Sequence, residues 1–336
     1  MTDITKAKLA FGPMSTESID AVFKYSETFR KEMMLIASKN QIDYSGGYVN
    51  NWNTAQYMNF VRKMRTRYPH ANVAICRDHC GPGFNGNHDL KDSRMTIKTD
   101  IENGFDLIHI DFCHYHGERE EMLARSREAT MYALSLNHRI ALEIGTDEND
   151  GSHYSAGEID RIASDVTFFK EFCNPEFFVV QTGSLIKEMQ QVGTFNQEFV
   201  GKIHGFLKSQ GLKLKEHNAD YLSVEEIEQR KGIVDAMNIA PQLGAVQTLT
   251  VLQQSRIYGV SPDAFLEEAY NGGKWKKWLN TNNPENRLLC STIAGHYHFA
   301  SENYKNLVDR LSKRTDIQEK ITNSLVEVIE HYGSSI

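Results

Sequence analysis

Short apolar runs recur along the chain at regular intervals, and an amphipathic or polar stretch separates each run from the next. The runs are Leu9–Met14, Met33–Ala37, Val73–Cys76, Leu107–Phe112, Ile140–Ile144, Phe177–Val180, Leu212–Glu216 and Ile233–Ile239. A short continuous apolar run that ends in polar or turn residues is typical of a strand buried in a parallel sheet. The pattern therefore predicts eight strands in series.

The stretches between these runs predict helices. Helical spacing covers 17–31, 54–67, 92–103, 118–136, 156–171 and 196–210, and a further helix follows Pro241. Regular strand–helix alternation means a parallel sheet, and eight units favour a closed (β/α)8 TIM barrel over an open sheet. No glycine-rich dinucleotide or P-loop motif follows any run, so nucleotide-binding folds have little support. We expect an α/β fold with the barrel over 1–260 and a C-terminal helical extension over 261–336, packed together as one structural domain.

Composition narrows the class of partner. The net charge of −7 argues against a nucleic-acid groove, which needs clustered lysine and arginine. The one basic cluster, Lys274 to Trp278, fits an amphipathic surface helix. Five scattered cysteines without a CxxC pair fit reduced core residues. No signal peptide or membrane-spanning apolar run is apparent, so we expect a cytoplasmic protein with no membrane or nucleic-acid partner.

Polar side chains stand at the C-terminal ends of the predicted strands. They are Ser38, Asn40, Asp78, His79, Asp111, Glu143, Gln181, His217 and Asn238. Each alone has an ordinary explanation, because a strand-end histidine is often a structural hydrogen-bonder and a strand-end aspartate is often a helix cap. In a barrel, however, these strand ends meet at the face where ligands bind. Together they predict one site.

The residue types in this set indicate a metal-assisted reaction. Two histidines and a carboxylate from separate strands suit a divalent metal such as Zn²⁺, with an open position for substrate. Such an ion polarises a carbonyl as a Lewis acid, and Asp78 beside it would move the proton. These parts serve an aldol cleavage, an epimerisation or an isomerisation equally well.

The remaining histidines and acids are less informative. His109 and Asp111 could form a ligand pair, because they alternate along one strand and therefore point the same way. His114 and His116 are weaker candidates for contact with metal or substrate, and the pair His296 and His298 fits a surface role in the helical tail. The acidic loop 147–150 lacks the twelve-residue calcium pattern with its closing glutamate.

Seven segments, in the same order, resemble the metal-dependent class II ketose-bisphosphate aldolases. The likeness is greatest to the tagatose-bisphosphate aldolase subunits, a branch described as non-catalytic. The segments are Ser38–Gln41 with Gly46–Tyr48, Arg77–Pro82, Gly104–Asp111, Leu142–Thr146, Val180–Gly183, Glu216–Tyr221 and Met237–Ile239. The resemblance implies a carbon–carbon lyase that acts on a ketose or ketose phosphate and uses a divalent metal.

The resemblance also implies roles for single residues. Asp78 matches the family's catalytic acid/base, and His79 and His217 match metal-binding histidines. Glu143 lies near a metal-associated glutamate, and Asn238 matches an asparagine that holds substrate oxygens.

The chain departs from the catalytic aldolases at three places, one of which is the strand-eight motif, because it continues as Ala240 and Pro241 without the acidic and hydroxyl residues expected there. Gln181 stands where those enzymes carry another metal histidine, and its carbonyl oxygen is a weaker ligand than imidazole. No glycine-rich phosphate loop follows His217, which leaves the backbone N–H groups around Gly183 and Ser184 as candidates for one phosphate. We therefore expect metal ligands at His79, Glu143, His217 and Gln181, and substrate contacts at Ser38, Asn40, Asp111, Gly183, Ser184 and Asn238.

Three functions stay open from the sequence. The first is a metal-dependent aldolase, with Zn²⁺ as the leading cofactor and Mn²⁺ or Co²⁺ as alternatives. The second is a metal-dependent sugar or sugar-phosphate epimerase on the same site. The third is a non-catalytic subunit that stabilises a separate tagatose-bisphosphate-type aldolase. The expected small-molecule partner is a sugar or sugar phosphate. The expected protein partner is a second copy of the chain or an aldolase subunit.

Overall fold

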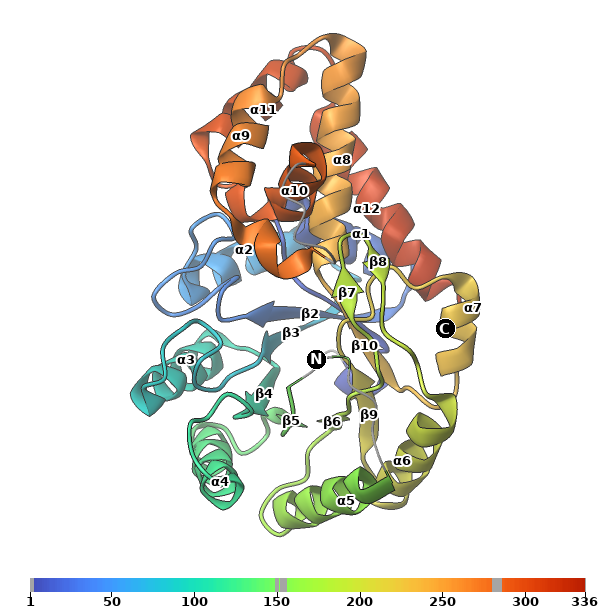
Figure 1. The fold of residues 1–336 in the computed structure, drawn as a ribbon. Helices are drawn as coiled ribbons and strands as arrows, with labels where there is room; N and C mark the ends of the chain where they lie inside the picture. Colours follow the sequence, from blue (N-terminus) through green and yellow to red (C-terminus); the bar gives the residue numbers. More distant parts are fainter. Residues whose placement is uncertain (1–2, 149–150, 152–155, 280–285, 336) are drawn as a thin grey trace.

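The structure, a computed structural model, describes residues 3–148, 151, 156–279 and 286–335. Within these residues, eight parallel strands close into a barrel in the order β1-β10-β9-β6-β5-β4-β3-β2 (Figure 1). The predicted (β/α)8 barrel is confirmed. The strands are β1 (Leu9–Phe11), β2 (Glu32–Ser38), β3 (Asn72–Asp78), β4 (Leu107–Asp111), β5 (Ala141–Gly145), β6 (Phe177–Val179), β9 (Lys213–Glu216) and β10 (Ala236–Ile239).

Helices surround the barrel, and their boundaries follow local capping chemistry. Ser15, Asn53 and Ser223 each open a helix with a capping box, and Gly104 ends another in the left-handed conformation. The surrounding helices are α1 (Thr16–Phe29), α2 (Thr54–Arg67), α3 (Leu90–Asn103), α4 (Arg119–Leu136), α5 (Ala156–Lys170), α6 (Gln197–Ser209), α7 (Val224–Arg230) and α8 (Pro241–Tyr258), and a 3-10 turn, η1 (Ile4–Lys6), precedes β1.

A few elements differ from the sequence-based expectation. β1 stops at Phe11 because Gly12 and Pro13 follow, and a Cβ at Gly12 would lie 2.6 Å from the Ala240 Cβ. The short helix α7 has too few residues to show a clear period. The two-residue strands β7 (Ile186–Lys187) and β8 (Gln190–Gln191) form a hairpin after β6 that the sequence pattern did not reveal.

Side-chain alternation along the strands determines what faces the inside of the barrel. Alternate residues point to opposite sides of a strand. Cys76, Leu107 and Ala236 lie in the inner core. The residues two positions further along, Asp78, His109 and Asn238, therefore point inward nearer the C-terminal mouth.

One buried ion pair fixes the strand that carries Asp78. Arg77, next to it in β3, is fully buried and makes a bidentate pair with Asp100 of α3. Its guanidinium also donates to the carbonyl oxygens of Ala37 and Ile42. The end of β2, β3 and α3 are thus joined directly behind the strand ends.

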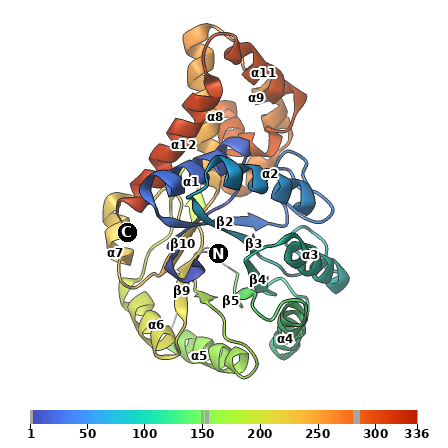
Figure 2. The ribbon, with the colours of Figure 1, turned by 180° about the vertical axis from the view of Figure 1, so that it is seen from behind.

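The C-terminal helices extend the molecule to one side of the barrel (Figures 1 and 2). α12 returns along α8 and α1, and a small separate apolar core forms around Trp275, Cys290 and Ile293. The elements are α9 (Asp263–Asn271), η2 (Lys274–Trp278), α10 (Arg287–Ala294), η3 (Gly295–His298), α11 (Glu302–Ser312) and α12 (Ile317–Gly333).

Two expectations for this region need correction or detail. The surface role expected for His296 is wrong: its exposure is 1%, because Gly244 of α8 lacks a side chain and lets the imidazole pack against the helix. The basic cluster is a 3-10 helix in which Trp275 is buried and the lysines are exposed. Among the described residues, no helix combines the length and apolarity needed to cross a membrane.

Candidate metal centre

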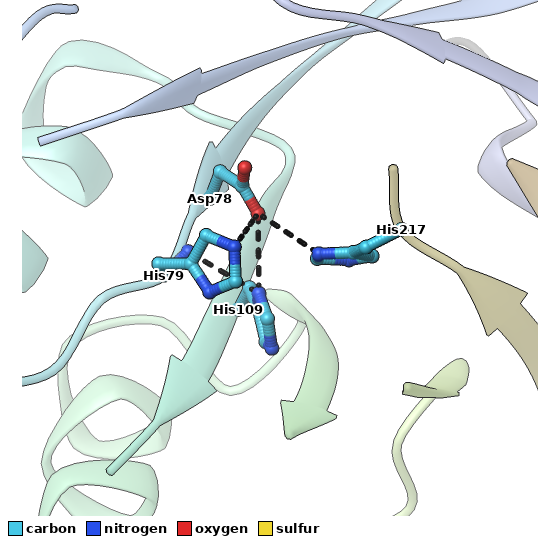
Figure 3. A group of neighbouring side chains, drawn as sticks. All are labelled: Asp78, His79, His109 and His217. Atoms are coloured by element: carbon cyan, nitrogen blue, oxygen red, sulfur yellow. Dashed lines mark hydrogen bonds and ion pairs between the residues drawn. The ribbon is translucent and has the colours of Figure 1, made fainter. Parts of the chain in front are cut away.

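Three imidazoles and one carboxylate meet at the mouth of the barrel (Figure 3). Asp78 ends β3, His79 follows it with a left-handed φ of 44°, His109 lies in β4, and His217 follows β9. One potential ligand atom from each residue lies within 4.8 Å of all the others. The Asp78 Oδ1 atom is 3.7 Å from His79 Nε2, 3.3 Å from His109 Nδ1 and 3.9 Å from His217 Nδ1.

Two of these imidazoles are each oriented by a carboxylate that contacts the ring nitrogen farther from Asp78. Asp111 Oδ2 lies 2.7 Å from His79 Nδ1, and Glu143 Oε1 lies 2.8 Å from His217 Nε2. In both rings the nitrogen nearest Asp78 is the other one. Metal-binding histidines commonly use their second nitrogen in this way, because the carboxylate fixes the tautomer and the ring orientation.

The carboxylate behind His217 is itself held by a buried lysine. Lys215 Nζ lies 2.5 Å from Glu143 Oε2, and both side chains are fully buried. Burial alone would raise the pKa of Glu143, but the charges of Lys215 and His109 outweigh it and lower that pKa to about 2. Glu143 is therefore ionised, with one oxygen on Lys215 and the other on His217.

The two residues at the end of β3 have opposite pKa shifts. Burial would raise the pKa of Asp78, but the positive charges of His79 and His217 hold it well below its usual value. Burial would lower the pKa of His79, but Asp78 and Asp111 outweigh it and raise that pKa to about 9. Burial is the dominant influence at His217, and its pKa is lowered.

His109 occupies space that β5 leaves open. The backbone N–H of His79 donates to the Nδ1 atom of His109, and the Nε2 atom is buried with no hydrogen-bond partner in the part of the chain that the structure describes. A Cβ at Gly145 of β5 would lie 2.6 Å from that Nε2 atom. Only glycine therefore fits opposite His109.

The donor set fits a divalent metal. Three imidazoles and a carboxylate are a common ligand set for Zn²⁺ and related ions. Two of the imidazoles have the oriented second nitrogen that metal sites require, and the third carries a buried polar atom without a partner. Of the metal ligands expected from the sequence, His79 and His217 belong to this cluster.

The other two expected metal residues lie beside the cluster. One carboxylate oxygen of Glu143 contacts Lys215, and the other contacts His217. Gln181 lines a cavity of about 170 Å³ together with His79 and His217, and its amide nitrogen donates to the Glu148 carbonyl oxygen. Asn149 and Asp150 of the acidic loop lie outside the described residues.

Three of the six expected substrate residues, Ser38, Asn40 and Asp111, line the two cavities at this mouth. Ser38 and Asn40 line an adjoining cavity of about 770 Å³ with Asp78 and His79. Asp111 holds His79. Asn238 is buried and lines neither cavity, and among the described residues its amide nitrogen and oxygen have no hydrogen-bond partner.

Gly183 and Ser184 face a different environment. The Ser184 hydroxyl is buried and donates to Glu216, while Arg230 donates to that hydroxyl. A Cβ at Gly183 would lie 2.0 Å from the Thr194 carbonyl oxygen, which shows close backbone packing. Among the described residues that line the two cavities, neither Gly183 nor Ser184 is present.

Three residues of the site carry weak sequence signals. His109 and Lys215 lie on inward-facing strand positions, so strict alternation from Asp111 and His217 would have included them. Phe84, in the loop after β3, stacks on His79 with ring centroids 4.6 Å apart and also on His114. An aromatic residue in a loop has no period to reveal such a role.

Solved structures share this fold. A probable tagatose 6 phosphate kinase from Sinorhizobium meliloti 1021 matches with a TM-score of 0.82 and 15% identity, over 98% of this chain and 100% of that chain. A fructose-bisphosphate aldolase from Campylobacter jejuni matches with a TM-score of 0.66 and 14% identity, over 99% and 90%. An aldolase from Escherichia coli K12 matches with a TM-score of 0.54 and 14% identity, over 90% and 92%.

No protein-family model and no curated protein matches the sequence. The three structural likenesses show that this chain shares its fold with these proteins.

Proposed function

We propose that the protein is a metal-dependent lyase that cleaves or forms a carbon–carbon bond in a ketose or ketose phosphate. One observation carries the proposal. The Nε2 atom of His79 and the Nδ1 atom of His217 lie nearest Asp78, while their other nitrogens contact Asp111 and Glu143. Metal-binding histidines almost always place their second nitrogen on such an outer partner, often a carboxylate.

The metal would be held by the imidazoles of His79, His109 and His217, with Zn²⁺ as the leading candidate and Mn²⁺ or Co²⁺ as alternatives. A bound divalent ion would supply Lewis-acid polarisation of the ketose carbonyl and its neighbouring hydroxyl. Asp111 and Glu143 act as positioning residues through His79 and His217. Gln181 lies in the cavity wall beside them.

Asp78 would carry the proton transfer. Its lowered pKa keeps it ionised at neutral pH, so it acts as a base toward the substrate. In the cleavage direction its carboxylate accepts the proton of the carbinol hydroxyl. The carbon–carbon bond breaks, a new carbonyl forms at the carbinol carbon, and the electron pair moves to the ketose carbonyl oxygen. Synthesis is the reverse.

Neutral polar side chains would hold the sugar. The Asn238 amide has both a donor and an acceptor without protein partners, as expected of a group that binds a sugar hydroxyl. Leaving such an amide buried and unpaired costs free energy, and a ligand contact offsets that cost. Ser38 and Asn40 line the same mouth of the barrel.

Metal content is the first test. We expect near-stoichiometric Zn²⁺, Mn²⁺ or Co²⁺ in the purified protein by elemental mass spectrometry, and loss of that metal in His79→Ala and His217→Ala. His138→Ala, which changes an exposed histidine before β5, is the matched control and should retain the metal. A protein that takes up no metal from any of these ions would remove the basis of the proposal.

Turnover is the second test. Asp78→Asn should keep its metal but lose about a hundredfold or more in turnover, the usual worth of a positioned acid or base. The assay should read cleavage products and epimers of the same ketoses, since retro-aldol cleavage with rebinding gives an epimer. A metal-loaded protein that is inactive alone and becomes active only with a separate aldolase subunit would support the subunit alternative instead.

A further inference from the structure

The large cavity at the barrel mouth has two walls of different charge. The barrel contributes Asp78, and the loop after β5 contributes Glu148. Among the described residues that line this cavity and the smaller one beside it, the only lysine or arginine side chains are Lys274 and Lys277. Both belong to η2 in the C-terminal extension. The fixed positive charge therefore comes from outside the barrel.

Among the residues that the structure describes, no carboxylate neutralises either ammonium group. Within the described residues, Lys274 and Lys277 have no salt-bridge partner at 4.0 Å or less. Lys277 Nζ instead lies 4.4 Å from the Trp278 ring centroid and 5.7 Å from that of Tyr297. Aromatic faces hold a cation in place without cancelling its charge, so it remains available to an anion.

Hydrogen bonds to the β7–β8 hairpin, which follows β6, fix the position of η2. The backbone N–H of Glu188, in the β7–β8 turn, donates to the Trp278 carbonyl oxygen at 2.6 Å. Lys187 Nζ donates to the Lys277 carbonyl oxygen at 3.0 Å. On its other side, the Gln191 amide donates to the Asn218 carbonyl oxygen, beside His217. The hairpin, which Figure 1 shows between the barrel and the extension, thus links η2 to the metal-centre loop.

Of the two histidines in this wall, His296 does not add charge. Burial, then the charges of Lys277 and His298, lower the pKa of His296 to about 3. Its imidazole is neutral at physiological pH and stands beside Tyr48 and Tyr297 as part of the cavity lining. This wall thus presents the Lys274 and Lys277 ammonium groups beside aromatic side chains and the neutral imidazole of His296.

We propose that Lys274 and Lys277 form an anion-binding subsite, and that the substrate carries a phosphate or carboxylate group that they bind while its carbonyl end meets Asp78. The placement of the substrate carbonyl at Asp78 rests on the proposed function. The anion-binding subsite does not. An anion is favoured here because two unpaired cations otherwise repel each other. A neutral sugar would leave both lysines without an anionic partner. It would also contact the carboxylates of Asp78 and Glu148 at the opposite wall.

Lysine reactivity tests the subsite without any turnover. The protein is treated with acetic anhydride in the presence of inorganic phosphate or acetate, and modification of each lysine is followed by peptide mass spectrometry. Lys276 is an internal control, because it lies in the same 3-10 helix and is exposed but does not line the cavity. We expect protection of Lys274 and Lys277 by about tenfold while Lys276 changes less than about twofold.

The two probes separate the chemical classes. Stronger protection by phosphate than by acetate would indicate a phosphate monoester, and equal or stronger protection by acetate would indicate a sugar acid. Parallel protection of the three lysines, or no protection of Lys274 and Lys277, would overturn the inference. That result would leave the metal content and the role of Asp78 untouched.

Substitutions give a second measurement. Lys277→Met and Lys274→Met should each raise KM for the anionic ketose by about tenfold with little change in kcat, since a charge-assisted contact is lost in the ground state and in the transition state alike. Lys276→Met removes the same charge from the same helix and should leave KM unchanged. Equal KM values for the anionic ketose and its neutral counterpart would contradict the subsite.

Discussion

At the scale of single residues, a metal bound as proposed would compete with a proton for the imidazole of His79. The pKa of His79 is about 9, because Asp78 and Asp111 outweigh the effect of burial. Without a metal, His79 therefore keeps its proton at neutral pH. A histidine must be neutral to act as a ligand, so metal binding has to displace that proton.

This competition makes metal affinity depend on pH. We predict that the affinity of the metal-free protein rises about tenfold per pH unit from neutrality to about pH 9 and then levels off. Calorimetric titrations in buffers of different ionisation enthalpy would measure the proton released. Asp111→Asn should lower the His79 pKa and shift the plateau to lower pH. A pH-independent affinity would show that His79 is not a ligand.

The same shift affects the stability of the metal-free protein, with a definite sign. The folded pKa of His79 lies above its ordinary value of 6.5, so the protonated imidazole stabilises the folded state. That contribution is fully present below about pH 6.5 and is lost as pH rises through about 9. Denaturant titrations across this range should show the decline, and bound metal should abolish it.

At the scale of elements, the absence of a side chain at Gly145 of β5 leaves room for the imidazole of His109 in β4. Gly145 is in register with Asp111, and a Cβ there would lie 2.6 Å from His109 Nε2. We predict that Gly145→Ala displaces His109 and weakens metal binding at least tenfold, although it changes no ligand. Metal affinity by competition with a chelator is the measurement.

A glycine elsewhere provides the control for this change. Gly205 lies within α6, and a Cβ there would meet no atom within 4 Å. Gly205→Ala should leave metal affinity unchanged and stabilise the fold by up to about 1 kcal/mol through helix propensity. If Gly145→Ala bound metal as tightly as the wild type, His109 would not belong to the ligand set.

These elements also show what the sequence can and cannot reveal. The apolar runs and their polar ends predicted all eight barrel strands and brought Asp78, His79 and His217 to one face, because parallel strands share their direction. The β7–β8 hairpin has strands of two residues, too short for any period. The role of η2 in the cavity depends on long-range docking, so a surface helix was the natural expectation for Lys274.

At the scale of the whole molecule, the last helix reaches back to the loop that carries His217. Tyr332, near the end of α12, is fully buried. Its hydroxyl accepts a hydrogen bond from the Leu222 N–H at 3.2 Å and donates to the Gln242 side chain at 2.9 Å. The Gln242 oxygen also accepts from the backbone N–H of Tyr221. The extension therefore supports the segment just beyond the metal centre.

This link predicts that barrel and extension unfold together. Tyr332→Phe keeps the ring but leaves a buried N–H and an amide oxygen short of a partner, which should lower the free energy of unfolding by about 1–3 kcal/mol. Tyr258→Phe, at a half-exposed tyrosine, is the matched control and should change it by less than about 0.5 kcal/mol.

Two probes of the same urea titration test the cooperativity. Far-UV circular dichroism reports all helices, whereas tryptophan fluorescence reports Trp275 and Trp278 of the extension together with Trp52 of the barrel. A single unit gives coincident transitions, and Tyr332→Phe should shift both by the same amount. If only the fluorescence transition moved, the extension would be an independent unit. The cavity wall formed by Lys274 and Lys277 would then open without unfolding of the barrel.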